Sequence, residues 1–516
     1  MKKGIVKERG GIMMNRQLTF LIALATLLPG ALTLDSKALG QPPEAYDIVL
    51  LGGRVMDPES GLDAIRNVGI RGDRIVEISE NALRGEETVD ASGLVVAPGF
   101  IDPHAHGQTN RANEFQAHDG VTTALELESG KAFLREWLAL RTGNAVINFG
   151  ASVAHGGLRW MSMERYADQA RLADRRVRKG DGDYRRLLEI ASQVGGARHH
   201  TLNEGETAAL LKRLRAGLEA GGLGIGVPVG YYPESSRDEL FRVFALAAAQ
   251  QVPIFIHPRE GRIPGIQESI SNAAITGAPL HIVHMNSMAL GEIEVALDMV
   301  ASAQKQGLDI TTEVYPYTAG STSLESVIFD EGWQERFSIS YQDIQSIATG
   351  ERLSEETFNK YRKQGGTVIL HMMKPEWIEA GVRSPLTMIG SDGMPYAPGA
   401  HPRSAGTFSR VLGRYVREQN TLGLMTALGK MTILTAKRLE GVAPMMHLKG
   451  RIQVGCDADI TVFDPDRILD TANFEDDLSF SEGIHHVLVN GAFVVKNGGT
   501  VSGSHPGRPI LGRYRR

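Results

Sequence analysis

The chain has 516 residues, of which 42% are hydrophobic and 22% charged, and its formal net charge is −5. These proportions are those of an ordinary globular protein, and the sequence holds no long basic tract, which argues against nucleic acid as a partner. The single cysteine, Cys456, excludes an intramolecular disulfide and a cysteine-rich metal cage.

The N-terminal segment has the features of an export signal. Residues 14–16 supply a short positive start, residues 18–28 are almost continuously apolar, and small residues at 38–40 precede Gln41. The apolar run is shorter than the roughly 20 residues that span a membrane. We therefore expect residues 1–40 to be a signal peptide of a periplasmic or secreted protein that meets the membrane only through this signal, with an uncleaved anchor as the alternative.

Short strands separated by turn residues are predicted at both ends of the chain. They are residues 47–55, 67–70, 73–78, 459–463 and 486–491. We expect these distant β-rich ends, residues 41–97 and 444–516, to pair into one small β-sandwich. A larger domain, residues 98–443, would then be inserted between them.

The middle of the chain alternates apolar strands with amphipathic helical segments such as residues 206–220 and 236–250. The eight predicted strands are residues 95–100, 121–128, 145–153, 222–229, 252–257, 279–284, 309–315 and 387–391. This alternation predicts an α/β fold, a (β/α)₈ TIM-type barrel whose catalytic groups lie at the C-terminal strand ends. The long connection at about residues 318–384 is predicted to be a lid or subdomain.

Polar side chains stand at the ends of several predicted strands. His104 and His106 follow the first strand one residue apart, so they point to the same face, and Asp102 can orient or hold the same cluster. The other strand-end candidates are Glu126 and Glu128, His257, His284 and Asp392. Because a barrel brings these ends to one mouth, the sequence predicts a site for Zn²⁺ or another divalent ion.

Specific motifs accompany these residues. They lie at residues 99–106, 120–123, 155–159, 315–322, 390–393, 401–403 with 406–408, and 449–452 with 457–459. From about residue 46 to its end, the chain resembles the amidohydrolase superfamily and, within it, the D-aminoacylases, which are N-acyl-D-amino-acid deacylases. The resemblance implies that the metal ligands are His104, His106, His257, His284 and Asp392.

In that family a cysteine near the end of strand two contacts the metal. This chain departs from the pattern, because it has Ser129 at about that position. Glu128, or Glu126 on the same strand face, can supply a carboxylate that bridges two ions, and Glu128 is preferred because it is nearer the strand end. Residues 222–229 contain no lysine, which disfavours a carbamylated-lysine bridge. One or two Zn²⁺ ions are expected, with another divalent metal as the alternative.

The resemblance implies hydrolysis of the amide bond of an N-acyl-D-amino acid or a related small acylated molecule. A divalent ion lowers the pKa of bound water from 15.7 to about 7, and Asp392 would act as the general base and then protonate the leaving amine. Arg403 is the expected partner of the substrate carboxylate, with Tyr231 and Tyr315 as hydrogen-bonding partners. Asn286 stands where the family commonly has a lysine, and it is predicted to lie in the same pocket.

Two other functions compete with this one. The same metal site would also suit a cyclic amide, a lactone or a dipeptide, which the Ser129 and Asn286 departures keep open. An exported binding or scaffold protein without catalysis is the third, and the presence of Asp392 and of all the histidines argues against it. The expected partner is a small acylated substrate, and the sequence makes no prediction of the oligomeric state.

Overall fold

The computed structural model describes residues 45–179, 184–194 and 197–513. The predicted signal peptide, residues 1–40, lies outside the described residues. Among the helices that are described, none is both long enough and apolar enough to cross a membrane.

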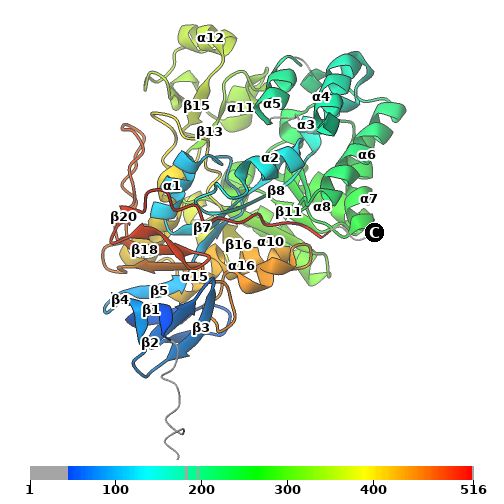
Figure 1. The fold of residues 1–516 in the computed structure, drawn as a ribbon. Helices are drawn as coiled ribbons and strands as arrows, with labels where there is room; N and C mark the ends of the chain where they lie inside the picture. Colours follow the sequence, from blue (N-terminus) through cyan, green and yellow to red (C-terminus); the bar gives the residue numbers. More distant parts are fainter. Residues whose placement is uncertain (1–44, 180–183, 195–196, 514–516) are drawn as a thin grey trace, which may run out of the picture. The chain divides into compact units, whose positions relative to one another are not determined.

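Eight parallel strands form the central sheet, in the order β16-β12-β11-β10-β9-β8-β7-β6. They are β6 (Phe100–Asp102), β7 (Val121–Lys131), β8 (Asn148–Ala154), β9 (Ile225–Pro228), β10 (Ile254–His257), β11 (Leu280–Ile282), β12 (Ile310–Val314) and β16 (Thr387–Ile389). Figure 1 labels β7, β8, β11 and β16 of this sheet. Just beyond the two outer strands, the His106 N–H donates to the Gly393 carbonyl at 2.8 Å. This contact brings β6 beside β16 and nearly closes the sheet, so the predicted barrel is confirmed.

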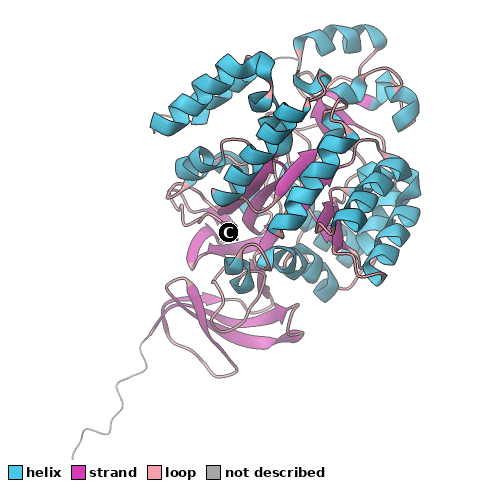
Figure 2. Ribbon diagram, turned by 90° about the vertical axis from the view of Figure 1, so that its right-hand side faces the viewer, coloured by secondary structure: helices cyan, strands magenta, loops and turns pink. Residues whose placement is uncertain are grey.

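Helices follow most of these strands and cover their outer faces (Figure 2). They are α1 (Asn110–His118), α2 (Leu134–Arg141), α3 (His155–Ser162), α4 (Ala167–Lys179), α5 (Tyr184–Ser192), α6 (Glu204–Glu219), α7 (Arg237–Gln250), α8 (Arg262–Thr276), α9 (Met285–Ala289), α10 (Ile293–Lys305), α13 (Pro375–Arg383), α14 (Arg403–Arg410), α15 (Leu424–Met431) and α16 (Ile433–Glu440). Local sequence sets where the helices begin. Asn203 and Glu206 form a reciprocal capping box at α6, and the Ser236 hydroxyl accepts from the Glu239 N–H at α7.

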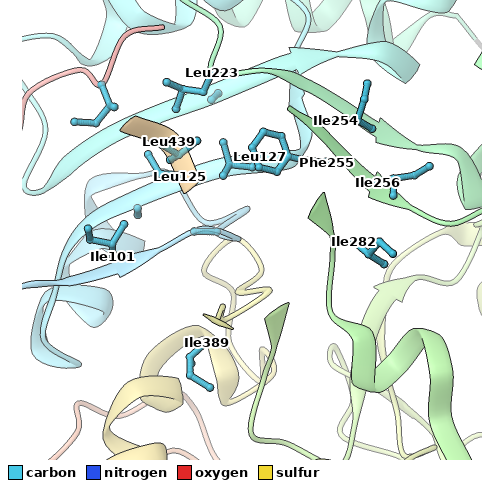
Figure 3. Close-up of a cluster of buried hydrophobic side chains, with 14 of the residues drawn as sticks. Ile101, Leu125, Leu127, Leu223, Ile254, Phe255, Ile256, Ile282, Ile389 and Leu439 are labelled. Carbon is cyan, nitrogen blue, oxygen red and sulfur yellow. The ribbon is translucent and has the colours of Figure 1, made fainter. Parts of the chain in front are cut away.

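The barrel core is built from apolar side chains of neighbouring strands. Figure 3 shows Ile101, Leu125, Leu127, Phe255, Ile282 and Ile389 together with others of the same cluster. Both faces of a parallel sheet are covered, so its strands carry nearly continuous hydrophobic runs rather than alternating ones. A charged residue inside such a strand is therefore an exception that needs a partner.

The two ends of the chain share a second, mixed sheet, as predicted. Its strands are β1 (Tyr46–Asp57), β2 (Leu62–Arg71), β3 (Arg74–Ser79), β4 (Gly85–Asp90), β5 (Val95–Pro98), β17 (Ile460–Phe463), β18 (Ile484–Val489), β19 (Ala492–Lys496) and β20 (Gly499–Thr500). The two halves meet where β5 pairs antiparallel with β17, with Ile460 opposite Pro98 and Phe463 opposite Val95.

The predicted strand at residues 95–100 is two strands in the structure. β5 belongs to the terminal sheet and β6 to the barrel, and Gly99 separates them. A Cβ atom at Gly99 would lie 2.2 Å from the Thr122 side chain, so only glycine fits at this crossing.

The long connection between β12 and β16 folds as a subdomain. It holds the antiparallel sheet β13-β15-β14, made of β13 (Gly320–Ser323), β14 (Ile344–Ser346) and β15 (Thr367–Leu370), with α11 (Trp333–Phe337) and α12 (Glu355–Gln364). Its own apolar core includes Phe329, Trp333 and Phe358. The connection is therefore a packed unit, and its first strand reaches the mouth of the barrel.

Candidate metal centre and its two cavities

The predicted metal ligands converge at the C-terminal ends of the barrel strands. His104 and His106 follow β6, Glu128 lies in β7, and His257 ends β10. His284 and Asp392 lie just beyond β11 and β16. His106 is partly exposed and the other five side chains are buried. The barrel thus brings together residues that are up to 288 positions apart in the sequence, from His104 to Asp392.

Glu128 lies between two pairs of histidines. Its Oε2 is 3.4 Å from His104 Nε2 and 3.3 Å from His106 Nε2. Its Oε1 is 2.8 Å from His257 Nδ1 and 3.4 Å from His284 Nε2. Because each oxygen faces a different pair, this carboxylate has the arrangement of a bridging ligand.

Asp392 completes the side of the cluster formed by the first histidine pair. Its Oδ1 lies 3.5 Å from His104 Nε2 and 3.3 Å from His106 Nε2, and its Oδ2 lies 2.9 Å from Arg403 Nη2. Burial alone would raise the pKa of Asp392, but the Arg403 and His104 charges hold it well below its usual value. Its backbone has a positive φ of 50°, a strained conformation of a kind found at functional sites.

Carboxylates behind the cluster orient the two histidines of the first strand. Glu313 of β12 accepts a hydrogen bond from His104 Nδ1, and its other oxygen lies 3.1 Å from His281 Nε2. Both oxygens of Glu126 lie 3.1 Å from His106 Nδ1. With Nδ1 donating to a carboxylate, each ring turns the lone pair of Nε2 toward the centre of the site.

Glu313 was not predicted from the sequence. It is a charged residue in an otherwise apolar and threonine-containing strand, Ile310–Val314, and this contrast is the one signal that marks it. Burial would raise its pKa, but the charges and hydrogen bonds of His104 and His281 lower it to about 2. Glu313 is therefore ionised at neutral pH.

Asp102 holds the backbone of the site. Its carboxylate accepts from the N–H groups of His104 at 3.0 Å and Ser391 at 2.9 Å, and from the Ser391 hydroxyl. These contacts fix the end of β6 against the end of β16. Asp102 was predicted to orient or hold the cluster, and in the structure it contacts the backbone that carries His104 and the Ser391 residue beside Asp392.

The donor atoms fit a divalent ion. Two groups of side chains, His104 with Glu128 and His284, and His104 with His106 and Asp392, bring ligand atoms within 4.8 Å of one another. In the part of the chain that is described, no other such group of three is found. Imidazole nitrogen and carboxylate oxygen donors without thiolate suit Zn²⁺ and similar first-row ions.

Two cavities meet at this cluster. The first, of about 340 Å³, is lined by Arg403 and Tyr315 and is called the Arg403 cavity. The second, of about 400 Å³, is lined by Trp160 and Phe133 and is called the Trp160 cavity. The residues that line both are Tyr231, His284, Ser321, Thr322 and Asp392. The metal cluster therefore lies at their junction.

The Arg403 guanidinium is 1% exposed and stacks over the Tyr315 ring, with its Cζ 4.7 Å from the ring centroid. Its Nη2 contacts Asp392, while Nε and Nη1 have no hydrogen-bond partner among the described residues. A buried cation with free donors is costly unless a ligand pairs with it. This arrangement suits a carboxylate that enters the cavity.

The remaining predicted substrate residues lie in different surroundings. The Tyr231 hydroxyl is 3.1 Å from Thr322 Oγ1, and its ring lies 4.8 Å from the His257 ring. The Asn286 amide instead pairs with the backbone of Tyr315, with donor–acceptor distances of 3.2 and 3.4 Å. Asn286 forms no part of the walls of either cavity, so the structure places it behind Tyr315.

A buried ion pair lies outside the cluster. Glu239 accepts from His155 Nε2 at 2.8 Å and from Arg159 Nε at 2.8 Å, and all three side chains are fully buried. Arg159 also donates to the carbonyls of Ala197 and His200. The motif at residues 155–159 therefore ties chain segments together.

Known proteins share this architecture. A model of the amidohydrolase family matches residues 87–495. The D-aminoacylase of Alcaligenes xylosoxydans xylosoxydans is 31% identical over 509 residues, which cover 92% of this chain and 99% of that protein. The N-acyl-D-glutamate deacylase of the same organism is 30% identical over 481 residues, which cover 87% of this chain and 94% of that protein. The solved N-acyl-D-glutamate deacylase of Bordetella bronchiseptica, complexed with zinc and a phosphonate inhibitor, has a TM-score of 0.76 and 25% identity, covering 91% of this chain and 100% of its own.

Proposed function

Because the chain belongs to the amidohydrolase family and is a hydrolase of carbon–nitrogen bonds other than peptide bonds, we propose that it deacylates N-acyl-D-amino acids or related small acylated molecules. The observation that carries the proposal is the position of Arg403. Its buried guanidinium contacts Asp392 at the edge of the metal cluster and keeps two groups free to donate. A substrate with a carboxylate close to its scissile amide fits this juxtaposition.

We propose that Zn²⁺, as one or two ions, is held by His104, His106, Glu128, His257, His284 and Asp392. When bound, such an ion polarises the carbonyl and makes water acidic enough to attack at neutral pH. Glu126 and Glu313 keep the first two imidazoles oriented for this task. Glu128 keeps the two histidine pairs at a fixed separation.

Asp392 is the proposed general base. Its pKa lies well below its usual value, so the carboxyl is ionised and can accept the proton of the attacking water. The protonated carboxyl then gives this proton to the leaving amine, which restores the starting state. Arg403 holds the α-carboxylate of the substrate, and Tyr315, whose pKa burial raises to about 12, stays a neutral hydrogen-bond donor.

The test is hydrolysis of paired D- and L-N-acetyl amino acids with added Zn²⁺, beside Asp392→Asn. Turnover of the D series should fall by about 10²–10⁴-fold in the variant, the usual worth of a general base. Turnover of the L series alone would contradict the proposal. If cyclic amides, lactones or dipeptides are hydrolysed in place of both series, the alternative substrate class is correct.

We also propose that the protein is exported, and the charged and apolar pattern of residues 14–41 supports this. Expression of the full chain followed by fractionation and N-terminal sequencing tests it. A mature protein that begins near Gln41 in the periplasm or medium is expected. An uncleaved chain in the cytoplasm would contradict the proposal.

A further inference from the structure

We propose that the Trp160 cavity is the acyl subsite and that it accepts apolar acyl groups much larger than acetyl, such as a hexanoyl chain or an aromatic ring. This inference rests on the proposed deacylase function. It concerns which part of the substrate enters which cavity, and it follows from the residues that the two cavities do and do not share.

The positions of the charged groups set the direction of the substrate. Arg403 lines the first cavity and is absent from the walls of the second. A carboxylate held by Arg403 therefore places the amino-acid half in the Arg403 cavity. His284 and Asp392 line both cavities, so the scissile amide lies at the junction. The acyl half must then continue into the Trp160 cavity.

The walls of the Trp160 cavity beyond the junction combine aromatic and aliphatic side chains with polar ones such as Ser129 and Ser323. They include Phe133, Ala154, Trp160, Tyr184 and Leu188. The Phe133 and Trp160 side chains are 5% and 6% exposed, so both are packed against the rest of the protein. The cavity volume is about 400 Å³. A single methyl group occupies a volume on the order of one water, roughly 30 Å³, so acetyl would leave most of this space unfilled.

Two cations also line this cavity, and neither is buried as Arg403 is. Lys131 is partly exposed and its Nζ lies 3.3 Å from Glu126 Oε2, and Arg198 is exposed. Neither is a buried cation with free donors of the kind that Arg403 presents. The cavity therefore favours an apolar acyl group over one that carries a second carboxylate.

The Arg403 cavity also has an apolar wall of its own, which can bind the side chain of the amino acid. Val327, Ile328, Phe337, Leu370 and Met372, all from the subdomain at residues 318–384, line this wall. The two halves of the substrate are thus recognised by different elements, and changes to one cavity should leave selection in the other intact.

The experiment measures kcat/KM of the zinc-loaded protein for N-acetyl-, N-butanoyl-, N-hexanoyl- and N-phenylacetyl-D-leucine. One added methylene in a fitting apolar pocket is worth about tenfold or more in discrimination, and a hexanoyl group has four more methylenes than acetyl. If the pocket contacts even one of the four, the hexanoyl-to-acetyl ratio is at least about tenfold. A ratio that is flat or falls with chain length would overturn the inference.

Two variants that fill the Trp160 cavity, Ala132→Phe and Ala191→Phe, should each lower the hexanoyl-to-acetyl ratio by about tenfold. Ala191 is partly exposed on α5, so its variant tests the cavity even if Ala132→Phe fails to fold. The matched control is Ile328→Phe in the Arg403 cavity, which should change selection between D-alanine and D-leucine derivatives and leave the acyl ratio unchanged. The reverse pattern would overturn the assignment of the cavities.

A binding measurement tests the acyl subsite separately from the proposed deacylase activity. The dissociation constants of N-acetyl- and N-hexanoyl-D-leucine are measured by calorimetry on Asp392→Asn and on Asp392→Asn with Ala191→Phe. Tighter binding of the hexanoyl compound that the second variant loses supports the acyl subsite, even if no compound is hydrolysed. Equal binding of the two compounds would overturn it, even if both are hydrolysed.

Discussion

Replacing Glu313 by glutamine should weaken zinc binding although Glu313 is not a predicted ligand. The two carboxylate oxygens accept from His104 Nδ1 and His281 Nε2, whereas a glutamine side chain has one acceptor oxygen. One buried imidazole N–H therefore loses its acceptor or the His104 ring turns. A hydrogen bond to a charged group is worth about 1.5–3 kcal/mol, which corresponds to a loss of roughly 10- to 100-fold in affinity.

The assay is competition for Zn²⁺ between the metal-free protein and a chromophoric chelator, at fixed pH. Glu239→Gln is the matched control, because Glu239 is also buried and bonded to a histidine but contacts His155 and Arg159 instead of the cluster. It should lower the free energy of unfolding and leave zinc affinity unchanged. Zinc affinity of folded Glu313→Gln within threefold of the wild type would refute the reasoning, as would an equal loss in the control.

Three further predictions concern residues around the site and in the core. Arg403→Met should lower kcat/KM for N-acetyl-D-amino acids by at least about 100-fold, because it removes charge-assisted bonds to the carboxylate, and steady-state kinetics that show less than a tenfold loss would contradict this role. Asp119→Asn should lower the free energy of unfolding by about 1–3 kcal/mol in urea titrations, because the carboxylate accepts from the N–H groups of Phe408 and Ser409 in α14, the helix that carries Arg403. The effect of Lys430→Met on stability should depend on pH. Burial lowers the Lys430 pKa from 10.5 to about 7, so the wild type gains stability as pH rises between these values. In urea titrations, the free energy of unfolding of the variant minus that of the wild type should therefore be more positive at pH 6.5 than at pH 9. An equal difference at both pH values would contradict the lowered pKa of Lys430.

The convergence of the candidate ligand side chains could be predicted from the sequence because a parallel barrel brings residues at the ends of its strands close together in space. Each of His257, His284 and Asp392 follows an apolar strand, and a parallel barrel brings such ends to one mouth. The prediction needed no knowledge of side-chain geometry. The alternation of strands and helices and the chemistry of imidazole and carboxylate predicted a metal site at the mouth, and the resemblance to the amidohydrolase superfamily implied which residues are its ligands.

Other features depend on contacts that the sequence does not display. Glu313 and His104 are 209 positions apart, and no spacing rule links them. The break at Gly99 depends on the close approach of Thr122, which belongs to the next strand. Asn286 was predicted to lie in the substrate pocket, and the turn at His284, with φ of 29°, begins the short helix that directs its amide to the Tyr315 backbone.

The sequence offered Glu126 and Glu128 as alternatives for the second strand, and the structure shows why both belong to the site. Residues two apart in a strand share a face of the sheet, so both carboxylates lie on the face where His104 and His106 stand. Asp102 pairs with Ala124, and just beyond this pair His104 forms a bridge with Glu126. Glu126 then reaches His106 from behind, at Nδ1, while Glu128 reaches Nε2 from the front. For His106 the neighbouring strand therefore supplies two carboxylates, one that orients the ring and one that shares its ligand face, whereas the ring of His104 is oriented by Glu313 of β12.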